Sequence, residues 1–128
     1  DNKLIFDGEY LNGKRRGKGK EYNDGHLIFD GEYLNGLRHG KSKEYDNNDN
    51  IIFEGEYLNG KKWKGKGKEY DYKGRLIFEG EYLNGLRHGK AKVYDKKGNL
   101  IFEGEYLNGK KWNGKGFNED KEDYEDRR

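Results

Sequence analysis

The stretch Gly55-Glu56-Tyr57-Leu58-Asn59-Gly60 decides the fold, because it recurs with the same six residues five times in a chain of 128 residues. The copies are separated by 23, 24, 25 and 24 residues and begin at Gly8, Gly31, Gly55, Gly80 and Gly104. Recurrence at a nearly constant period is the sequence signature of a repeat architecture. We therefore expect one small structural unit, used five times in succession.

Each repeat contains two stretches with strand character, joined by a turn. In the first repeat Phe6, Gly8 and Tyr10 occupy alternate positions, which is the period of a β-strand. Asn12-Gly13 is a favoured two-residue hairpin turn, and residues 17–22 return as a second strand. Linkers rich in Asn, Asp and Gly lead to the next repeat. Each repeat is thus predicted to be one β-hairpin.

We predict an all-β fold, an elongated single-layer antiparallel β-meander of stacked β-hairpins. The repeats span approximately residues 4–26, 27–50, 51–75, 76–99 and 100–116. One hairpin alone buries too little apolar surface to offset the entropy lost on ordering its backbone. Neighbouring hairpins must therefore stack and share a common aromatic face.

The aromatic residues of the strands are predicted to line that one face. Every repeat supplies a Phe and a Tyr from its first strand, and the first four repeats add a Tyr near the end of the second strand. The glycine between Phe and Tyr leaves room for a neighbouring ring. The predicted face consists of Phe6, Tyr10, Tyr22, Phe29, Tyr33, Tyr45, Phe53, Tyr57, Tyr70, Phe78, Tyr82, Tyr94, Phe102 and Tyr106.

The composition excludes several kinds of chemistry. The absence of Cys excludes disulfides, thiolate metal sites and Cys nucleophiles, and favours a cytoplasmic protein. With 41% charged and 30% hydrophobic residues the chain resembles a disordered one, but all 21 glycines fall at equivalent positions, which indicates a folded repeat. No apolar run is long enough for a membrane span or a signal peptide, and the lack of an initial Met suggests a fragment.

The position of the basic residues is the strongest functional signal. The 27 Lys and Arg nearly balance the 25 Asp and Glu, yet the segment after each Asn-Gly turn is mostly basic. Stacked hairpins would align these residues on one edge, which could attract anions. Alternatively, they are solvated hairpin tips whose charge the strand carboxylates offset. This candidate anion-binding or membrane-binding edge comprises Lys14, Arg15, Arg16, Arg38, His39, Lys61, Lys62, Trp63, Lys64, Arg87, His88, Lys110, Lys111 and Trp112.

Two tryptophans stand beside lysines in this edge. Trp63 and Trp112 occur in the third and fifth repeats, whose loops are one residue longer. Amphipathic rings next to lysines suit a membrane interface or a protein-binding hot spot. Alternatively, each ring folds back over its own hairpin as a local lid.

We predict no catalytic, cofactor-binding or metal site. The Asp/Glu-Gly-Glu carboxylates recur five times, whereas acid–base catalysis needs one environment that separates two pKa values. His39 and His88 lie two repeats apart, too far to share a metal ion. Residues 36–42 resemble a phosphate-binding loop, but the spacing is one residue short and no helix is predicted after it.

The last twelve residues leave the pattern. Residues 117–128 contain six acidic side chains, followed by Arg127 and Arg128. Acidic residues near the start of a helix and arginines near its end are favourable for the helix macrodipole, and Asn118 could serve as the N-cap. This acidic tail is predicted either to form a short capping helix or to be disordered, because so short a helix is marginal alone.

The segment from Phe53 to Gly67 resembles the MORN repeat (membrane occupation and recognition nexus). The resemblance covers nearly the whole chain. It implies an elongated sheet of hairpins with aromatic residues on one face. It also implies the family's roles in scaffolding, dimerisation, cytoskeletal or membrane-junction assembly and phosphoinositide binding.

The Leu-Ile-Phe opening and the Lys-Glu-Tyr ending of the repeats are also similar to a bacterial variant found in antitoxin-like proteins. We therefore expect a non-catalytic scaffold or interaction module without cofactor or metal. Its expected partner is a protein, a second copy pairing with an open terminal strand, or an acidic phospholipid membrane on which it is peripheral. The alternatives are an antitoxin-like inhibitor and a targeting domain of a larger enzyme. Nucleic acid is not expected, because glutamates interrupt the basic stripe.

Overall fold

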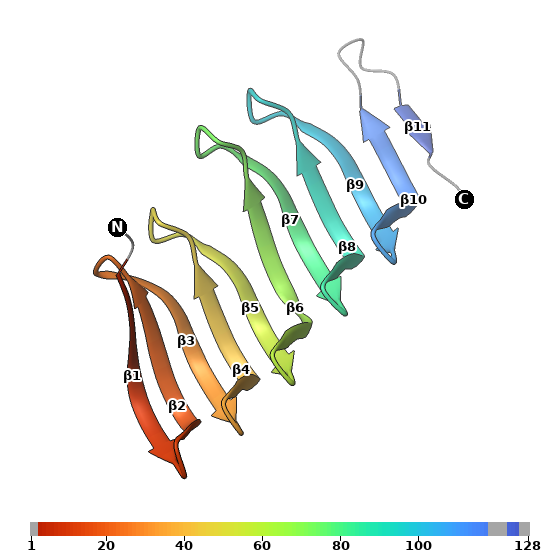
Figure 1. Ribbon diagram of the computed structural model, residues 1–128. Coiled ribbons are helices and arrows are strands. Elements are labelled where there is room, and N and C mark those ends of the chain that lie inside the picture. The colour runs from red at the N-terminus through yellow and green to blue at the C-terminus, as the bar shows by residue number, and fades with distance from the viewer. Residues whose placement is uncertain (1–2, 118–122, 126–128) are drawn as a thin grey trace. The chain divides into compact units, whose positions relative to one another are not determined.

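The computed structural model describes residues 3–117 and 123–125, which belong to two compact units, Asp1–Gly65 and Lys66–Arg128 (Figure 1). The strands of the described residues are β1 (Leu4–Leu11), β2 (Lys14–Asn23), β3 (His26–Leu34), β4 (Leu37–Tyr45), β5 (Ile51–Leu58), β6 (Lys61–Tyr70), β7 (Leu76–Leu83), β8 (Leu86–Tyr94), β9 (Leu100–Leu107), β10 (Lys110–Phe117) and β11 (Asp123–Glu125). Strands β1 to β5 pair antiparallel in chain order in the first unit, and β7 to β11 do so in the second. The predicted all-β, single-layer meander of hairpins is confirmed.

Two kinds of turn connect the strands, and in each unit they lie at opposite ends of the strands (Figure 1). The Asn-Gly turns have positive φ at both residues, 53° at Asn35 and 86° at Gly36, as a type I′ hairpin requires. Later linkers begin with an aspartate whose carboxylate accepts backbone N–H groups, as Asp46 does from Asn48 and Asn50, both at 2.9 Å. The local sequence of each turn thus determines its geometry.

The core contains phenylalanines packed against tyrosines, and Phe6, Phe29 and Phe78 each contact the tyrosines of two successive hairpins. Phe29 is 0% exposed and Phe53 is 1% exposed. The Phe29 ring meets Tyr33 of its own hairpin at 5.6 Å and Tyr57 of the next hairpin at 5.3 Å, both edge to face. Phe78 is equally buried in the second unit. Hydrophobic burial therefore depends on the contact between hairpins.

Four tyrosines do not lie on this aromatic face, contrary to the prediction. They are the residues near the ends of the second strands, Tyr22, Tyr45, Tyr70 and Tyr94. In the β1–β2 pair Phe6 stands directly opposite Glu21, so Glu21 shares the aromatic face and the following residue points to the other side. The hydroxyl of Tyr94 accordingly donates to Glu79, which follows Phe78 and so faces away from the core. Strand alternation thus places the residue before each tyrosine on the aromatic face, a glutamate in the first three repeats and Val93 in the fourth.

Neighbouring strands approach each other closely at the central glycines of the first strands. A Cβ atom added at Gly55 would lie 2.2 Å from the backbone oxygen of Lys64 and 2.5 Å from Cα of Gly65. The neighbouring β4 position, Ser42, stands directly opposite Gly55 and already carries a side chain. Only glycine fits at Gly55, because the obstacle is backbone.

Replacing Gly55 by alanine is therefore expected to lower the free energy of unfolding by about 1–3 kcal/mol, as overpacking typically does. Urea denaturation followed by circular dichroism measures the loss. The control is Ser42→Ala, which adds no atom and should cost less than about 1.5 kcal/mol, the value of one hydrogen bond. Equal stability of the Gly55→Ala variant and the unmodified protein would contradict the close approach.

The C-terminal tail adds a strand to the second unit. Phe117 ends β10, and Asp123–Glu125 form β11, which pairs antiparallel with β10. The predicted capping helix is therefore wrong for Phe117 and for residues 123–125. The rest of that prediction falls on residues 118–122 and 126–128, which lie outside the described residues. No described helix has the length and apolar character needed to cross a bilayer.

Candidate functional site

Five of the predicted edge residues lie on the aromatic face. Arg15 stands opposite Tyr10 in the β1–β2 pair and Arg38 stands opposite Tyr33 in the β3–β4 pair, so alternation turns them toward the rings. Their charged groups cover the phenylalanines as cation–π partners. The distances to the ring centroids are 4.2 Å for Arg15 over Phe6, 4.0 Å for Arg38 over Phe29, 5.3 Å for Lys62 over Phe53, 4.0 Å for Arg87 over Phe78 and 4.8 Å for Lys111 over Phe102.

Arg38 also links three successive hairpins of the first unit. Its Nε and Nη2 atoms donate to the two carboxylate oxygens of Glu21 at 3.0 and 2.9 Å, and the Tyr33 hydroxyl donates to the same carboxylate. Its Nη1 atom donates to the Tyr57 hydroxyl at 3.4 Å, and that hydroxyl donates to Glu44 at 2.6 Å. The same arrangement recurs in the second unit with Arg87, Glu69, Tyr82 and Tyr106.

The protonation states of Glu21 and Tyr33 favour a structural role for this network, which we call the clamp. Burial alone would raise the pKa of Glu21, but the hydrogen bonds from Arg38 and Tyr33 and the charge of Arg38 hold it below its ordinary value. Burial and the Glu21 carboxylate raise the pKa of Tyr33 well above its usual range. Glu21 is therefore ionised and Tyr33 protonated at neutral pH, so neither is poised to exchange a proton there.

The hairpin ends of the first unit combine exposed leucines with exposed cations. Leu11, Leu34, Leu37 and Leu58 are 53%, 50%, 48% and 44% exposed. Lys14, Arg16 and Lys61 are exposed beside them. We call these seven residues the tip edge. The second unit presents exposed Leu86, Leu107 and Lys110 at its own hairpin ends.

Backbone hydrogen bonds join the tips of the first unit into one row. The N–H of Gly36 donates to the carbonyl of Arg15 at 2.9 Å, and the N–H of Gly60 donates to the carbonyl of Arg38 at 2.7 Å. Each turn is thereby held against the second strand of the preceding hairpin. The exposed leucines were missed at the sequence level, although a leucine precedes every Asn-Gly turn.

The two histidines of the predicted edge hold turns. Nδ1 of His39 accepts a hydrogen bond from the backbone N–H of Asn59 at 3.2 Å, and His88 does the same for Asn108 at 3.3 Å. Within the described residues, no group of three or more His, Cys, Asp or Glu side chains could hold a metal ion.

The tryptophans are half-buried in the sheet surface. Nζ of Lys64 lies 4.5 Å from the ring of Trp63. Trp112 occupies the irregularity in β10 where the register with β9 shifts between Lys111 and Asn113. Each tryptophan thus keeps part of its surface accessible.

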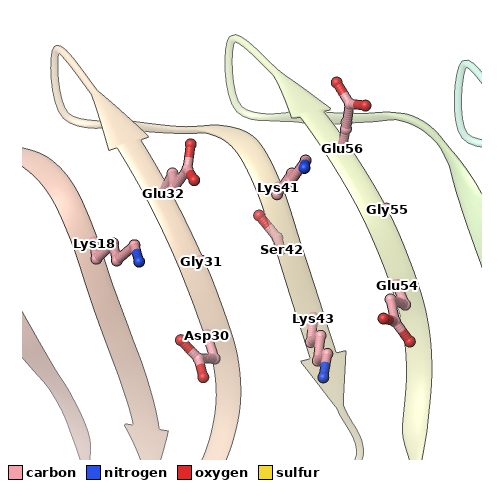
Figure 2. A pocket seen from close by; sticks show the side chains of 10 residues that line it. All are labelled: Lys18, Asp30, Gly31, Glu32, Lys41, Ser42, Lys43, Glu54, Gly55 and Glu56. Carbon is pink, nitrogen blue, oxygen red and sulfur yellow. The ribbon is translucent and has the colours of Figure 1, made fainter.

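The face opposite the aromatic rows carries alternating charges over a hollow of about 560 Å³ in the first unit (Figure 2). Lys41 and Lys43 of β4 stand between Asp30 and Glu32 of β3 and Glu54 and Glu56 of β5 (Figure 2). The register places Lys43 directly opposite both Asp30 and Glu54. The repeated carboxylates of β3 and β5 therefore alternate with the lysines of β4 across this face.

Comparison with protein-family models identifies the MORN repeat over residues 6–27, 29–50 and 78–100. The matched segments follow the hairpins β1–β2, β3–β4 and β7–β8 and together cover just over half of the chain. Comparison with curated proteins gives no match. On the extent of the family match, and with hairpins in the corresponding positions, the chain belongs to the MORN repeat family.

Proposed function

We propose that the chain binds acidic phospholipid surfaces, phosphoinositides among them, through the tip edge of its first unit. MORN repeats are non-catalytic interaction or scaffold modules, and this proposal names the partner. The observation that carries it is the row of half-exposed leucines interleaved with exposed cations at the hairpin ends. A contiguous set of exposed apolar side chains with polar neighbours is typical of a binding surface.

Both components of the tip edge would favour a charged bilayer. Fully burying a leucine side chain is worth about 1.5–3 kcal/mol, and these leucines keep about half of that surface to bury. A basic residue close to an anionic membrane contributes about 1 kcal/mol. Neither component alone gives tight binding, but a row that presents both at once supports reversible attachment.

The cations on the aromatic face are not part of this proposal. Arg15, Arg38 and Lys62 lie over phenylalanine rings and pair with Glu21 or Glu44 at 3.7, 2.9 and 3.4 Å. Their charge is largely balanced inside the protein. Attraction to lipid headgroups is therefore assigned to Lys14, Arg16 and Lys61.

The triple variant Lys14→Gln/Arg16→Gln/Lys61→Gln is expected to bind anionic vesicles roughly 100-fold more weakly, at about 1 kcal/mol for each cation. The measurement is co-sedimentation with phosphatidylcholine vesicles that contain a phosphatidylinositol bisphosphate. The matched control is Lys73→Gln/Lys96→Gln/Lys97→Gln, which removes the same charge from exposed linker residues and should leave binding unchanged.

A salt series and a leucine variant separate the two components. The effect of the cation variant should shrink as salt screens the charges, whereas Leu11→Ser/Leu34→Ser/Leu37→Ser should weaken binding at every salt concentration. Circular dichroism checks whether both variants fold. Equal binding by the two charge variants, or no binding to anionic vesicles at all, would overturn the lipid proposal.

A further inference from the structure

The outer side of β1 has no neighbouring strand in the described part of the first unit. Among the described residues β1 pairs with β2 only, whereas β3 pairs on both of its sides, with β2 and with β4. The outward backbone N–H and C=O groups of β1 therefore have no strand beside them within the described part of the chain. Such an edge can pair with another extended segment.

On the aromatic face, the tyrosine of β1 is much more exposed than the equivalent tyrosines of the next two hairpins. Tyr10 is 58% exposed, while its equivalents Tyr33 and Tyr57 are 4% and 3% exposed. The hydroxyls of Tyr33 and Tyr57 donate to glutamates Glu21 and Glu44 of the preceding hairpin. Within the described residues, no hairpin before β1 supplies a glutamate for the Tyr10 hydroxyl.

The contacts between successive hairpins show what would complete β1. Gly31 of β3 faces Gly19 of β2, while the flanking residues Asp30 and Glu32 face Lys20 and Lys18. The same register recurs between β4 and β5 and between β8 and β9, with Ser42 or Ala91 in the small position. In each case the second strand supplies lysine, a small residue and lysine opposite the Asp/Glu-Gly-Glu segment.

The β1 strand presents that same segment outward, as Asp7, Gly8 and Glu9. Asp7 has Lys20 on its β2 side only, whereas its equivalent Asp30 has a lysine on both sides, Lys20 and Lys43. The edge therefore has two carboxylates available for a lysine-bearing strand. Cross-strand pairs of opposite charge stabilise a sheet, and like charges destabilise it.

The residue between the two lysines must be small because the tyrosine of the following hairpin lies close to it. A Cβ atom added at Gly19 would lie 3.1 Å from Cε1 of Tyr33, the tyrosine of the following hairpin. Tyr10 would lie over an incoming strand in the same way. A large side chain opposite Gly8 would therefore displace the Tyr10 ring.

A second copy of this chain fits the edge poorly. Two β1 strands paired with each other would bring Asp7 and Glu9 of both copies onto one face, which like-charge repulsion disfavours. Three of the strands that carry the complementary pattern, β2, β4 and β8, already pair on both sides. The sequence-based expectation of pairing with another copy is therefore not the one we favour for this edge.

We propose that β1 binds, by strand addition, an extended segment of another protein with the pattern lysine, small residue, lysine, glutamate. Backbone hydrogen bonds would hold the segment. Asp7 and Glu9 would select its lysines, and Tyr10 would donate to its glutamate as Tyr33 does to Glu21.

The test uses two peptides and the full chain labelled with ¹⁵N. The first peptide is Gly-Lys-Ser-Lys-Glu-Tyr, which reproduces residues 40–45, and the second, Gly-Glu-Ser-Glu-Lys-Tyr, reverses its charges. NMR titration should show shifts at residues 4–11 and a roughly tenfold preference for the first peptide, from two or three cross-strand charge pairs. The variant Asp7→Lys/Glu9→Lys should prefer the second peptide.

A tethered version makes weak binding visible. Fusing the first peptide ahead of residue 1 through a Gly/Ser linker raises its effective concentration to about the millimolar range. Amide exchange in β1 should then slow relative to a fusion of the charge-reversed peptide. Equal affinity for both peptides, no inversion in the Asp7→Lys/Glu9→Lys variant, or equal exchange in the two fusions would overturn the proposal.

Discussion

Replacing Phe29 by alanine is expected to lower the free energy of unfolding of the first unit by about 3–5 kcal/mol, the cost of deleting a fully buried aromatic side chain. Phe29 is 0% exposed and contacts the rings of Tyr33 and Tyr57 and the guanidinium of Arg38. Its removal leaves a cavity between two hairpins. Urea unfolding followed by Trp63 fluorescence in a Trp112→Phe background reports on this unit.

Phe6→Ala provides the matched control. Phe6 makes the same kind of contacts, with Tyr10 and Tyr33, but it is half-exposed because β1 has no preceding hairpin among the described residues. Its loss should cost less than half as much as that of Phe29. Equal losses of stability for the two variants would show that the contact between successive hairpins is not the main source of stability of the core.

The second large effect is expected for Glu21→Ala, at about 3 kcal/mol, the lower end for removing one partner of a buried ion pair. The substitution leaves the Arg38 guanidinium and the Tyr33 hydroxyl without the carboxylate that now accepts from both. Glu54→Ala is the control, because Glu54 is an exposed carboxylate on the opposite face. Its loss should change stability by no more than about 0.5 kcal/mol. Urea unfolding measures both variants, and equal effects would contradict the clamp.

Acid should weaken the same network. Because the folded-state pKa of Glu21 is below its ordinary value, the stability it contributes is complete above the unfolded pKa of about 4.3 and is lost as pH falls through the folded value. The unmodified protein should therefore lose more stability than Glu21→Gln between about pH 5 and pH 3. Asp46 also has a lowered pKa but is present in both proteins, so it does not affect the comparison. Parallel pH profiles would show that Glu21 is not the titrating group.

The hairpins could be predicted because their signals are local. Asn12-Gly13 and its equivalents supply the positive φ values that a type I′ turn needs, and strand alternation around Gly8 follows from a few neighbouring residues. The repeat period then implied that the aromatic residues of successive hairpins must meet. The structure has this arrangement, with Phe29 between Tyr33 and Tyr57.

The cross-strand partners and the sheet face of the residues in the second strands were harder to predict from the sequence than the hairpins. Between Gly8 and Glu9 the register with β2 shifts, because two extra residues, Gly17 and Lys18, stand in β2 at that point. Two extra residues leave the alternation of faces unchanged, so Arg15 stays on the same face as Gly19, but the shift decides that Arg15 stands opposite Tyr10 and Arg16 opposite Glu9. Alternation counted along β2 from Gly19, the residue opposite Gly8, would have placed Tyr22 correctly. Glu21 is two residues after Gly19 and shares its face, so the adjacent Tyr22 lies on the other face.

The sequence by itself determined the repeat, its turns, the antiparallel order of strands and the concentration of basic residues beyond each turn, because all of these depend on neighbours within one hairpin. Only the tertiary structure divided those cations between the ring-covering clamp and the exposed tip edge, and within the described residues it leaves Tyr10 58% exposed and the outer side of β1 without a neighbouring strand. These features depend on cross-strand register and on which hairpin lies beside which. No single repeat contains that information.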